Sequence, residues 1–127
     1  MKVLLDTNRL SDALAEDDDV LELLETAEAI YVPVIVLGEI RSGFLHGKRR
    51  AANETRLQWF LAQDGVEALA IEPGVAHRYA EIHDSLRRRG KPIPTNDLWI
   101  AALAVEHGLM LYTRDAHFEA VPGLARL

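Results

Sequence analysis

Cysteine is absent from this 127-residue sequence, and no apolar run approaches the length needed to cross a membrane. The absence of cysteine excludes disulfides, thiolate zinc sites and a cysteine nucleophile, and it fits a reducing cytoplasm. The first apolar run, Val3-Leu4-Leu5, is too short for the core of a signal peptide. We therefore expect a cytoplasmic protein with neither a signal peptide nor a membrane-spanning segment.

Positive charge is also scarce, with 14 lysines and arginines against 20 aspartates and glutamates and a net charge of −6. A chain with this balance is not expected to coat nucleic acid nonspecifically, so contacts with phosphate must come from local basic clusters. The five histidines do not form a metal-ligand spacing such as His-Glu-x-x-His.

The length and the 49% content of hydrophobic residues predict one globular domain over residues 1–127. Short apolar runs alternate with longer segments of helical periodicity. The runs predict strands at residues 2–6, 29–32, 65–71 and 109–112, and a short edge strand after residue 122. Helices are predicted from residue 7, around residues 20–24, and at residues 33–45, 49–63, 75–89 and 96–107. The alternation predicts a three-layer α/β/α fold with a central, mostly parallel sheet and right-handed crossovers.

The last long helix, residues 96–107, is apolar on nearly every side and is predicted to be deeply buried. Thr95 is a natural N-cap for this helix, and Gly108 is expected to end it. Trp99 lies within the helix. Both Trp99 and Trp59 are interpreted as core or interface residues.

Four acidic residues stand where predicted strands end or lie on predicted helices, and they are the best clue to function: Asp6, Glu39, Asp97 and Asp115. Ligands of an open parallel sheet collect outside the carboxyl ends of its strands, so acids far apart in sequence can converge there. Carboxylates in one cleft repel each other, and a hard divalent cation relieves that repulsion. The sequence therefore predicts a metal-dependent phosphodiesterase.

Each acid has a structural reason to reach such a cleft. Asp6 ends the first strand and Asp115 follows the last, while Asp97 falls in the first turn of a helix, where the dipole stabilises a carboxylate. Glu39 has a side chain long enough to reach a metal from a helix face. Taken singly, an aspartate after a strand is usually a turn former or helix cap, so the prediction depends on the combination.

Four segments containing these acids resemble the motifs of PIN-domain ribonucleases, and more narrowly of VapC-type toxins from bacterial and archaeal toxin–antitoxin pairs. In order they are Leu4-Leu5-Asp6-Thr7-Asn8, Gly38-Glu39-Ile40-Arg41-Ser42-Gly43, Asn96-Asp97-Leu98-Trp99-Ile100-Ala101-Ala102 and Thr113-Arg114-Asp115-Ala116-His117-Phe118. The resemblance covers essentially the whole chain.

The resemblance implies an Mg²⁺- or Mn²⁺-dependent endoribonuclease whose acidic site is formed by the four carboxylates, with Thr7, Asn8 and Thr113 as supporting polar groups. A water made more acidic by the cation would attack the phosphodiester. Four carboxylates are compatible with one ion or with two. The resemblance also implies structured RNA as substrate and a homodimer. A cognate antitoxin is implied as well, and the acidic cleft predicts that its tail brings an Arg or Lys toward Asp6 and Asp97.

Arg9 departs from the family pattern, in which an apolar residue often follows Asp-Thr-Asn. Three interpretations stay open for Arg9: contact with RNA phosphate, pairing with an acid beside the site, or a solvent-facing position. His117 is interpreted as a loop-packing residue, with contact to the metal site or substrate as the alternative.

Other basic residues are candidates for contact with RNA. They are Arg41, the run Arg87-Arg88-Arg89 with Lys91, and the run Lys48-Arg49-Arg50. The first run also fits the end of a helix, where cations are favoured by the dipole, and this structural interpretation is preferred.

Other functions also occur on a parallel sheet of this kind. A haloacid-dehalogenase-like phosphatase would carry a second aspartate two residues after Asp6, where Asn8 stands. A receiver domain would need a paired acid cluster and a lysine at a strand end, which the sequence lacks. A catalytically silent interaction module on the same fold stays open.

Overall fold

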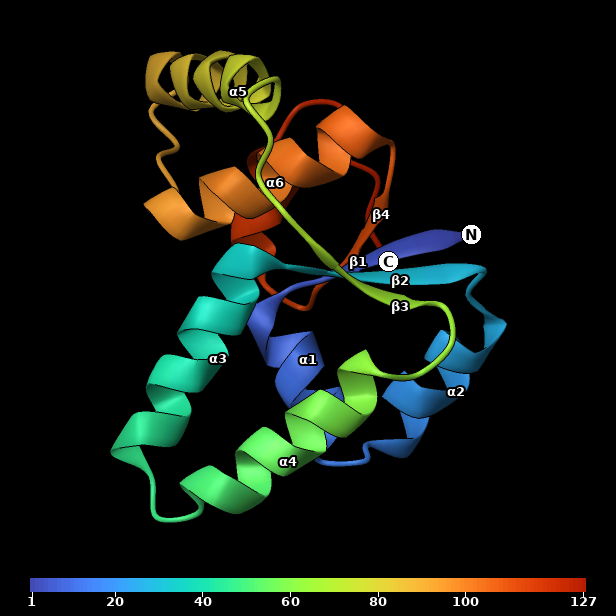
Figure 1. Ribbon diagram of the computed structural model, residues 1–127. Coiled ribbons are helices and arrows are strands. Elements are labelled where there is room, and N and C mark those ends of the chain that lie inside the picture. Colours follow the sequence, from blue (N-terminus) through green and yellow to red (C-terminus); the bar gives the residue numbers. More distant parts are fainter.

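The computed structural model describes residues 1–127, and a four-stranded parallel sheet lies at its centre (Figure 1). The strands are β1 (Lys2–Leu5), β2 (Ala29–Pro33), β3 (Val66–Leu69) and β4 (Met110–Tyr112), in the spatial order β3-β2-β1-β4. Val3 in β1 is in register with Ile30 of β2 and Met110 of β4. Because β1 pairs with β2 on one side and β4 on the other, the strand order reverses beside β1, which is where ligands bind in open sheets of this kind.

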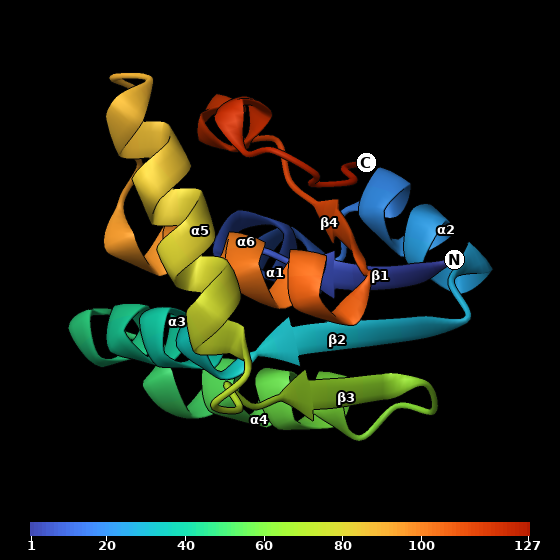
Figure 2. The same ribbon diagram turned by 90° about the horizontal axis from the view of Figure 1, so that it is seen from above.

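Helices cover both faces of the sheet, so the predicted three-layer α/β/α fold is confirmed. The helices are α1 (Thr7–Leu14), α2 (Asp18–Thr26), α3 (Val34–His46), α4 (Arg50–Leu61), α5 (Val75–Arg88) and α6 (Thr95–His107), followed by the 3₁₀ helix η1 (Ala116–Ala120). Figures 1 and 2 show α5 and α6 on one face and α1 to α4 on the other. No helix is long and apolar enough to span a membrane.

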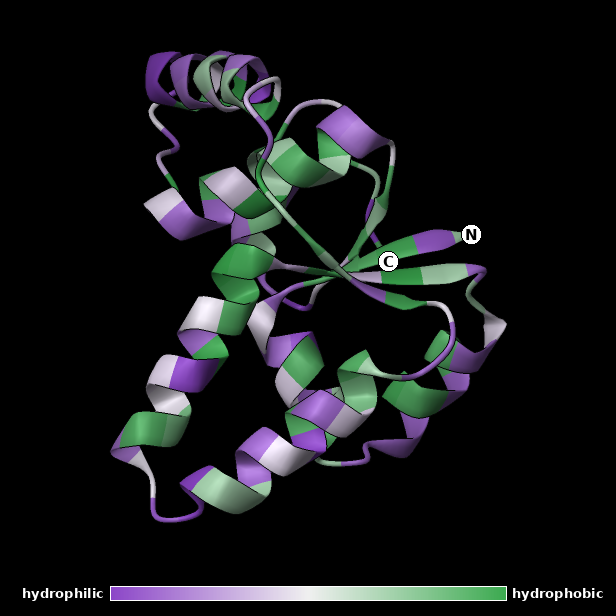
Figure 3. Ribbon diagram, in the orientation of Figure 1, coloured by the Kyte–Doolittle hydropathy of each residue, from purple (hydrophilic) through white to green (hydrophobic).

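The core explains the unbroken apolar runs of the sequence. Val3, Leu4 and Leu5 are completely buried because helices pack on both sides of β1. Figure 3 shows the hydrophobic colour concentrated on the strands and on α6, while α5 is mostly hydrophilic. Every residue from Ile100 to Ala104 in α6 is buried, as predicted for this helix.

Some boundaries and placements differ from the predictions. The first strand ends at Leu5, because Asp6 already acts as the N-cap of α1. Pro94 is the cap residue of α6 and Thr95 is its first helical residue, so the prediction that Thr95 is the N-cap is wrong. The predicted edge strand at the end of the chain is also wrong. Only an isolated bridge joins Arg126 to Leu111, flanked by two backbone hydrogen bonds.

The two tryptophans have different environments. Trp99 is half-buried, and its ring stacks on Tyr79 with centroids 4.1 Å apart. Trp59 lies on α4 with 66% of its surface exposed, so its interpretation as a core residue is wrong. An interface role for Trp59 stays a prediction.

Candidate metal centre

Asp6 lies between β1 and α1 and is almost fully buried, with 5% of its surface exposed. One carboxylate oxygen accepts a hydrogen bond from the Arg9 backbone N–H at 2.8 Å, which caps α1. The other oxygen accepts from the Thr113 hydroxyl. Burial raises the pKa of Asp6, whereas these two hydrogen bonds and the Arg9 charge lower it. The hydrogen bonds thus hold the carboxylate in one orientation, but they and Arg9 only partly offset the effect of burial, so the pKa of Asp6 stays raised.

Thr113 connects two of the acids across 107 residues of chain. Its hydroxyl donates to Asp6 and accepts from the backbone N–H of Asp115 at 3.0 Å. Thr113 directly follows β4, whose Tyr112 is in register with Leu5 of β1. The adjacent ends of β1 and β4 therefore bring Asp6, Thr113 and Asp115 together, as predicted from their positions after strands.

Asp97 completes the cluster from the first turn of α6. Burial raises its pKa to about 6, and repulsion by Asp115, Glu39 and Asp6 adds to the rise, opposed by His117. The three acidic neighbours act on Asp97 only because they lie close to it. The four predicted acids therefore lie close enough together to act on one another electrostatically.

Glu39 approaches the same cleft from α3. Its Oε1 atom accepts a hydrogen bond from the Thr7 hydroxyl at 2.8 Å, which joins α3 to the first turn of α1. A hollow of about 480 Å³ is lined by Glu39, Pro94, Thr95, Asn96, Asp97, Asp115 and His117. A second hollow, of about 520 Å³, shares Glu39 and Asn96 with the first and extends along α3.

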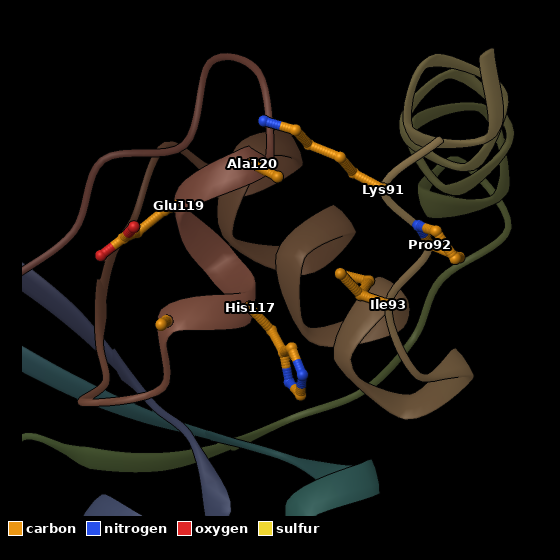
Figure 4. Close-up of a pocket in the computed structure, with 7 residues that line it drawn as sticks. Lys91, Pro92, Ile93, His117, Glu119 and Ala120 are labelled. Carbon is orange, nitrogen blue, oxygen red and sulfur yellow. The ribbon is translucent and has the colours of Figure 1, made fainter. Parts of the chain in front are cut away.

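His117 stands at the other side of the cleft. Its Nδ1 atom lies 3.1 Å from Asp115 Oδ1 and 3.7 Å from Asp97 Oδ2. His117 therefore contacts two of the predicted acids, so its interpretation as a loop-packing residue is wrong, and its contact with a metal or substrate stays a prediction. His117 also lines a third hollow, of about 420 Å³, together with Lys91 (Figure 4).

This donor set fits a divalent cation. One ligand atom from each of Asp97, Asp115 and His117 can be chosen so that all three lie within 4.8 Å of one another. Carboxylate oxygens are the ligands that Mg²⁺ and Mn²⁺ prefer, and the raised pKa values of Asp6 and Asp97 indicate that positive charge is needed.

The residues predicted to support the acids differ in whether they contact them. Thr7 and Thr113 contact the acids, as predicted, whereas Asn8 is exposed and forms no hydrogen bond to them. Arg9 is half-buried, with its guanidinium 4.3 Å from the centroid of the Tyr112 ring, so the solvent-facing interpretation is wrong. Arg9 does pair with an acid, at 3.3 Å, but that acid is Asp12 rather than one of the four.

The remaining basic residues lie outside the cluster. Arg41 on α3 forms two hydrogen bonds with Glu54 on α4. Arg87 and Arg88 pair with Asp84, and Arg89 donates to the Ala120 carbonyl. The run from Lys48 to Arg50 is exposed where the loop after α3 leads into the first residue of α4.

Sequence reasoning missed the role of Asp12. Its Oδ2 atom accepts from Arg9 and, at 2.7 Å, from Arg114 in the segment that carries Asp115. The spacing of three residues between Arg9 and Asp12 on a helix was a readable signal for the first pair. Nothing in the sequence indicated the second.

A family model described as PIN domain matches residues 3–124. The chain belongs to the PIN domain family. This PIN domain is 36% identical to ribonuclease VapC4 of Mycobacterium tuberculosis over 91 residues, 72% of this chain and 70% of the relative. It is 30% identical to ribonuclease VapC2 of Rickettsia felis over 129 residues, covering 98% of this chain and 95% of the relative.

Solved structures agree with this assignment. The PIN domain superposes on a crystal structure of VapBC2 from Rickettsia felis, bound to a promoter DNA fragment, with a TM-score of 0.89 and 29% identity. That match covers 100% of this chain and 98% of the other. The resemblance of the four sequence motifs is therefore confirmed at the level of the family and the fold.

Proposed function

We propose that this PIN domain is a metal-dependent endoribonuclease and the toxin of a toxin–antitoxin pair. Two features of a chain of this family support the proposal: Glu39, Asp97 and Asp115 line one hydrophilic hollow, and Thr113 links the buried Asp6 to Asp115. The relatives described as ribonucleases support RNA as the substrate class.

The four carboxylates, with Thr7 and Thr113 behind them, form the proposed catalytic site. Asp6, Asp97 and Asp115, with Glu39, would hold Mg²⁺ or Mn²⁺, which when bound acidifies water and stabilises charge on the phosphate. Thr113 and the Arg9 N–H hold Asp6 in one orientation, and Thr7 does the same for Glu39. These hydrogen bonds fix the orientation of both carboxylates before a cation binds, which lowers the entropic cost of binding it.

Contacts with the RNA backbone are proposed for cations around the cleft. Lys91 lines the hollow next to His117, and Arg87, Arg88 and Arg89 lie nearby in sequence. Asp84 now pairs with Arg87 and Arg88 at an exposed site, where such pairs contribute little and a phosphate can replace the carboxylate. Arg9 and Arg41 are the weaker candidates, because the carboxylates that pair with them, Asp12 and Glu54, are less exposed than Asp84.

Partners follow from the family and from the charge of the cleft. Complexes of the VapBC type among the structural neighbours support a cognate antitoxin. We propose that the antitoxin brings an Arg or Lys to Asp6 and Asp97, in place of the cation, and that the toxin acts as a homodimer in the cytoplasm. Sedimentation of the purified chain tests the dimer, and a co-complex with only acidic or apolar groups at the cleft contradicts the antitoxin contact.

The activity is tested by incubating antitoxin-free protein with total cellular RNA in Mg²⁺, in Mn²⁺ and in EDTA. Discrete fragments are expected with either metal and none with EDTA. Asp97→Asn should abolish cleavage, whereas Glu25→Gln, which removes an exposed carboxylate on α2, should preserve it. No cleavage by folded protein indicates an interaction module, and hydrolysis of phosphomonoesters alone indicates a phosphatase.

A further inference from the structure

We infer that His117 supplies a nitrogen ligand to the divalent cation in this cleft and that this ligand makes the site favour Mn²⁺ over Mg²⁺. The inference rests on the proposed function, because it concerns the same metal site. It adds an imidazole to the four predicted carboxylates and assigns the metal preference to one residue.

The distances around His117 are those of ligands sharing one ion. Two ligand atoms about 2.1 Å from an octahedral ion are roughly 3 Å apart when adjacent and roughly 4.2 Å apart when opposite. His117 Nδ1 lies 3.1 Å from Asp115 Oδ1 and 3.7 Å from Asp97 Oδ2. The His117 side chain is 56% exposed, so it has room to adjust around a cation placed among these three groups.

The local fold holds the imidazole at this place. Asp115 is the N-cap of η1 and accepts a hydrogen bond from the His117 backbone N–H at 2.9 Å. The next residue, Phe118, is 1% exposed and anchors η1 in the core. Figure 4 shows the His117 ring projecting away from η1, at the edge of the hollow that it lines with Lys91. The backbone is thus fixed on both sides of His117, so its side chain reaches the cleft from an anchored helix.

An imidazole changes which ion the site prefers. Mg²⁺ takes oxygen ligands and keeps much of its water, whereas imidazole nitrogen is a ligand typical of transition metals. A site with three or four carboxylates alone offers no such distinction. His117 therefore contributes binding energy to Mn²⁺ that Mg²⁺ does not receive.

The same distances have a second explanation. A protonated His117 would act as an internal cation that neutralises Asp97 and Asp115, and an incoming metal would then displace it. The two explanations differ in whether a His117 nitrogen is bound to the ion once the protein has taken up metal. Pulsed electron paramagnetic resonance of Mn²⁺ answers this, because a bound imidazole produces ¹⁴N modulation of the electron spin echo.

The assignment to His117 is tested with two variants and a control. His117→Ala and His117→Gln remove the imidazole from an exposed side chain, and circular dichroism verifies that both variants fold. His107→Ala is the matched control, since His107 ends α6 ten residues after Asp97, roughly 15 Å along the helix. His46, the last residue of α3, has its Nδ1 atom 2.8 Å from the Ser42 carbonyl oxygen.

We expect ¹⁴N modulation from bound imidazole in the unmodified chain and in His107→Ala, and none in either His117 variant. Isothermal titration should show Mn²⁺ affinity falling on the order of tenfold in the His117 variants, with Mg²⁺ affinity within about twofold. Mn²⁺ bound without ¹⁴N modulation, modulation that persists without His117, or equal losses for both metals overturns the inference alone. No binding of either metal by the unmodified chain overturns the proposed function as well.

Discussion

Asp12 on α1 and Arg114 beside the acidic cleft form an ion pair with 2.7 Å between Oδ2 and Nη1, although 102 residues separate them. The same oxygen lies 3.3 Å from Arg9 Nη1. One carboxylate thus joins the helix that follows Asp6 to the segment that carries Asp115. Asp12 therefore links the two segments that carry Asp6 and Asp115, in addition to the direct link through Thr113.

Replacement of Asp12 by Ala is expected to destabilise the protein by about 1–2 kcal/mol. Arg114 is exposed, so the loss of its ion pair costs little, whereas the half-buried Arg9 loses the carboxylate with which it forms an ion pair. Arg114→Met should therefore cost less, below about 1 kcal/mol. Urea unfolding of both variants measures the difference. Equal losses in the two variants would show that Arg9 does not depend on Asp12.

Thr113→Val tests the hydroxyl that connects Asp6 to Asp115. Valine has nearly the same shape as threonine, but it leaves a buried carboxylate oxygen and a backbone N–H without a hydrogen-bond partner. A loss of about 1–3 kcal/mol in the free energy of unfolding is expected, together with weaker metal binding. Thr113→Ser keeps the hydroxyl and should retain most of the stability and most of the metal affinity. Equal results for the Val and Ser variants in urea unfolding and Mn²⁺ titration would contradict a role for the Thr113 hydroxyl.

Stability of the metal-free protein should fall as the pH rises from about 4 to about 6. Folded Asp97 keeps its proton to about pH 6, whereas the unfolded chain releases it near 3.8, so the folded state binds more protons within this window. Above pH 6 the ionised carboxylate costs on the order of 2–3 kcal/mol. Asp6, whose pKa is also raised, adds to the fall with the same sign.

Asp97→Asn should remove most of this dependence and raise the midpoint of thermal unfolding in EDTA at pH 7. The measurement is a series of thermal melts between pH 4 and pH 8, with Glu25→Gln as the control. A parallel pH profile for Asp97→Asn and the unmodified chain would show that Asp97 is not the group responsible.

Arg9→Met tests the positive charge beside Asp6. Methionine can still pack on the Tyr112 ring, but the charge that lowers the pKa of Asp6 is lost. We expect the pKa of Asp6 to rise further, while Mn²⁺ binds roughly twofold to fivefold more tightly at pH 7, since a like charge near the cation is removed. Isothermal titration at low salt measures the affinity. Weaker Mn²⁺ binding at pH 7 would indicate that Arg9 acts by positioning Asp6 rather than by its charge.

Much of the fold and the core of the candidate site were readable from the sequence, because they depend on local rules. The continuous apolar run of β1 indicated a strand buried on both faces, and the position of Asp6 and Asp115 after strands indicated that they share one edge of the sheet. Parallel strands have their carboxyl ends at the same edge, so this much follows without coordinates. Asp97 and Glu39 were predicted from the same reasoning and from the family motifs.

Tertiary structure alone decided the relationships that span the chain. The contact of His117 with Asp97 and Asp115, the bridge from Asp12 to Arg114 and the exposure of Trp59 depend on how η1, α1 and α4 pack. Side-chain reach and burial are properties of the folded molecule, as is the pKa of about 6 at Asp97, which arises from neighbours brought together by the sheet. The sequence determined which chemical groups were available and which strands present them, and packing determined how far apart they lie.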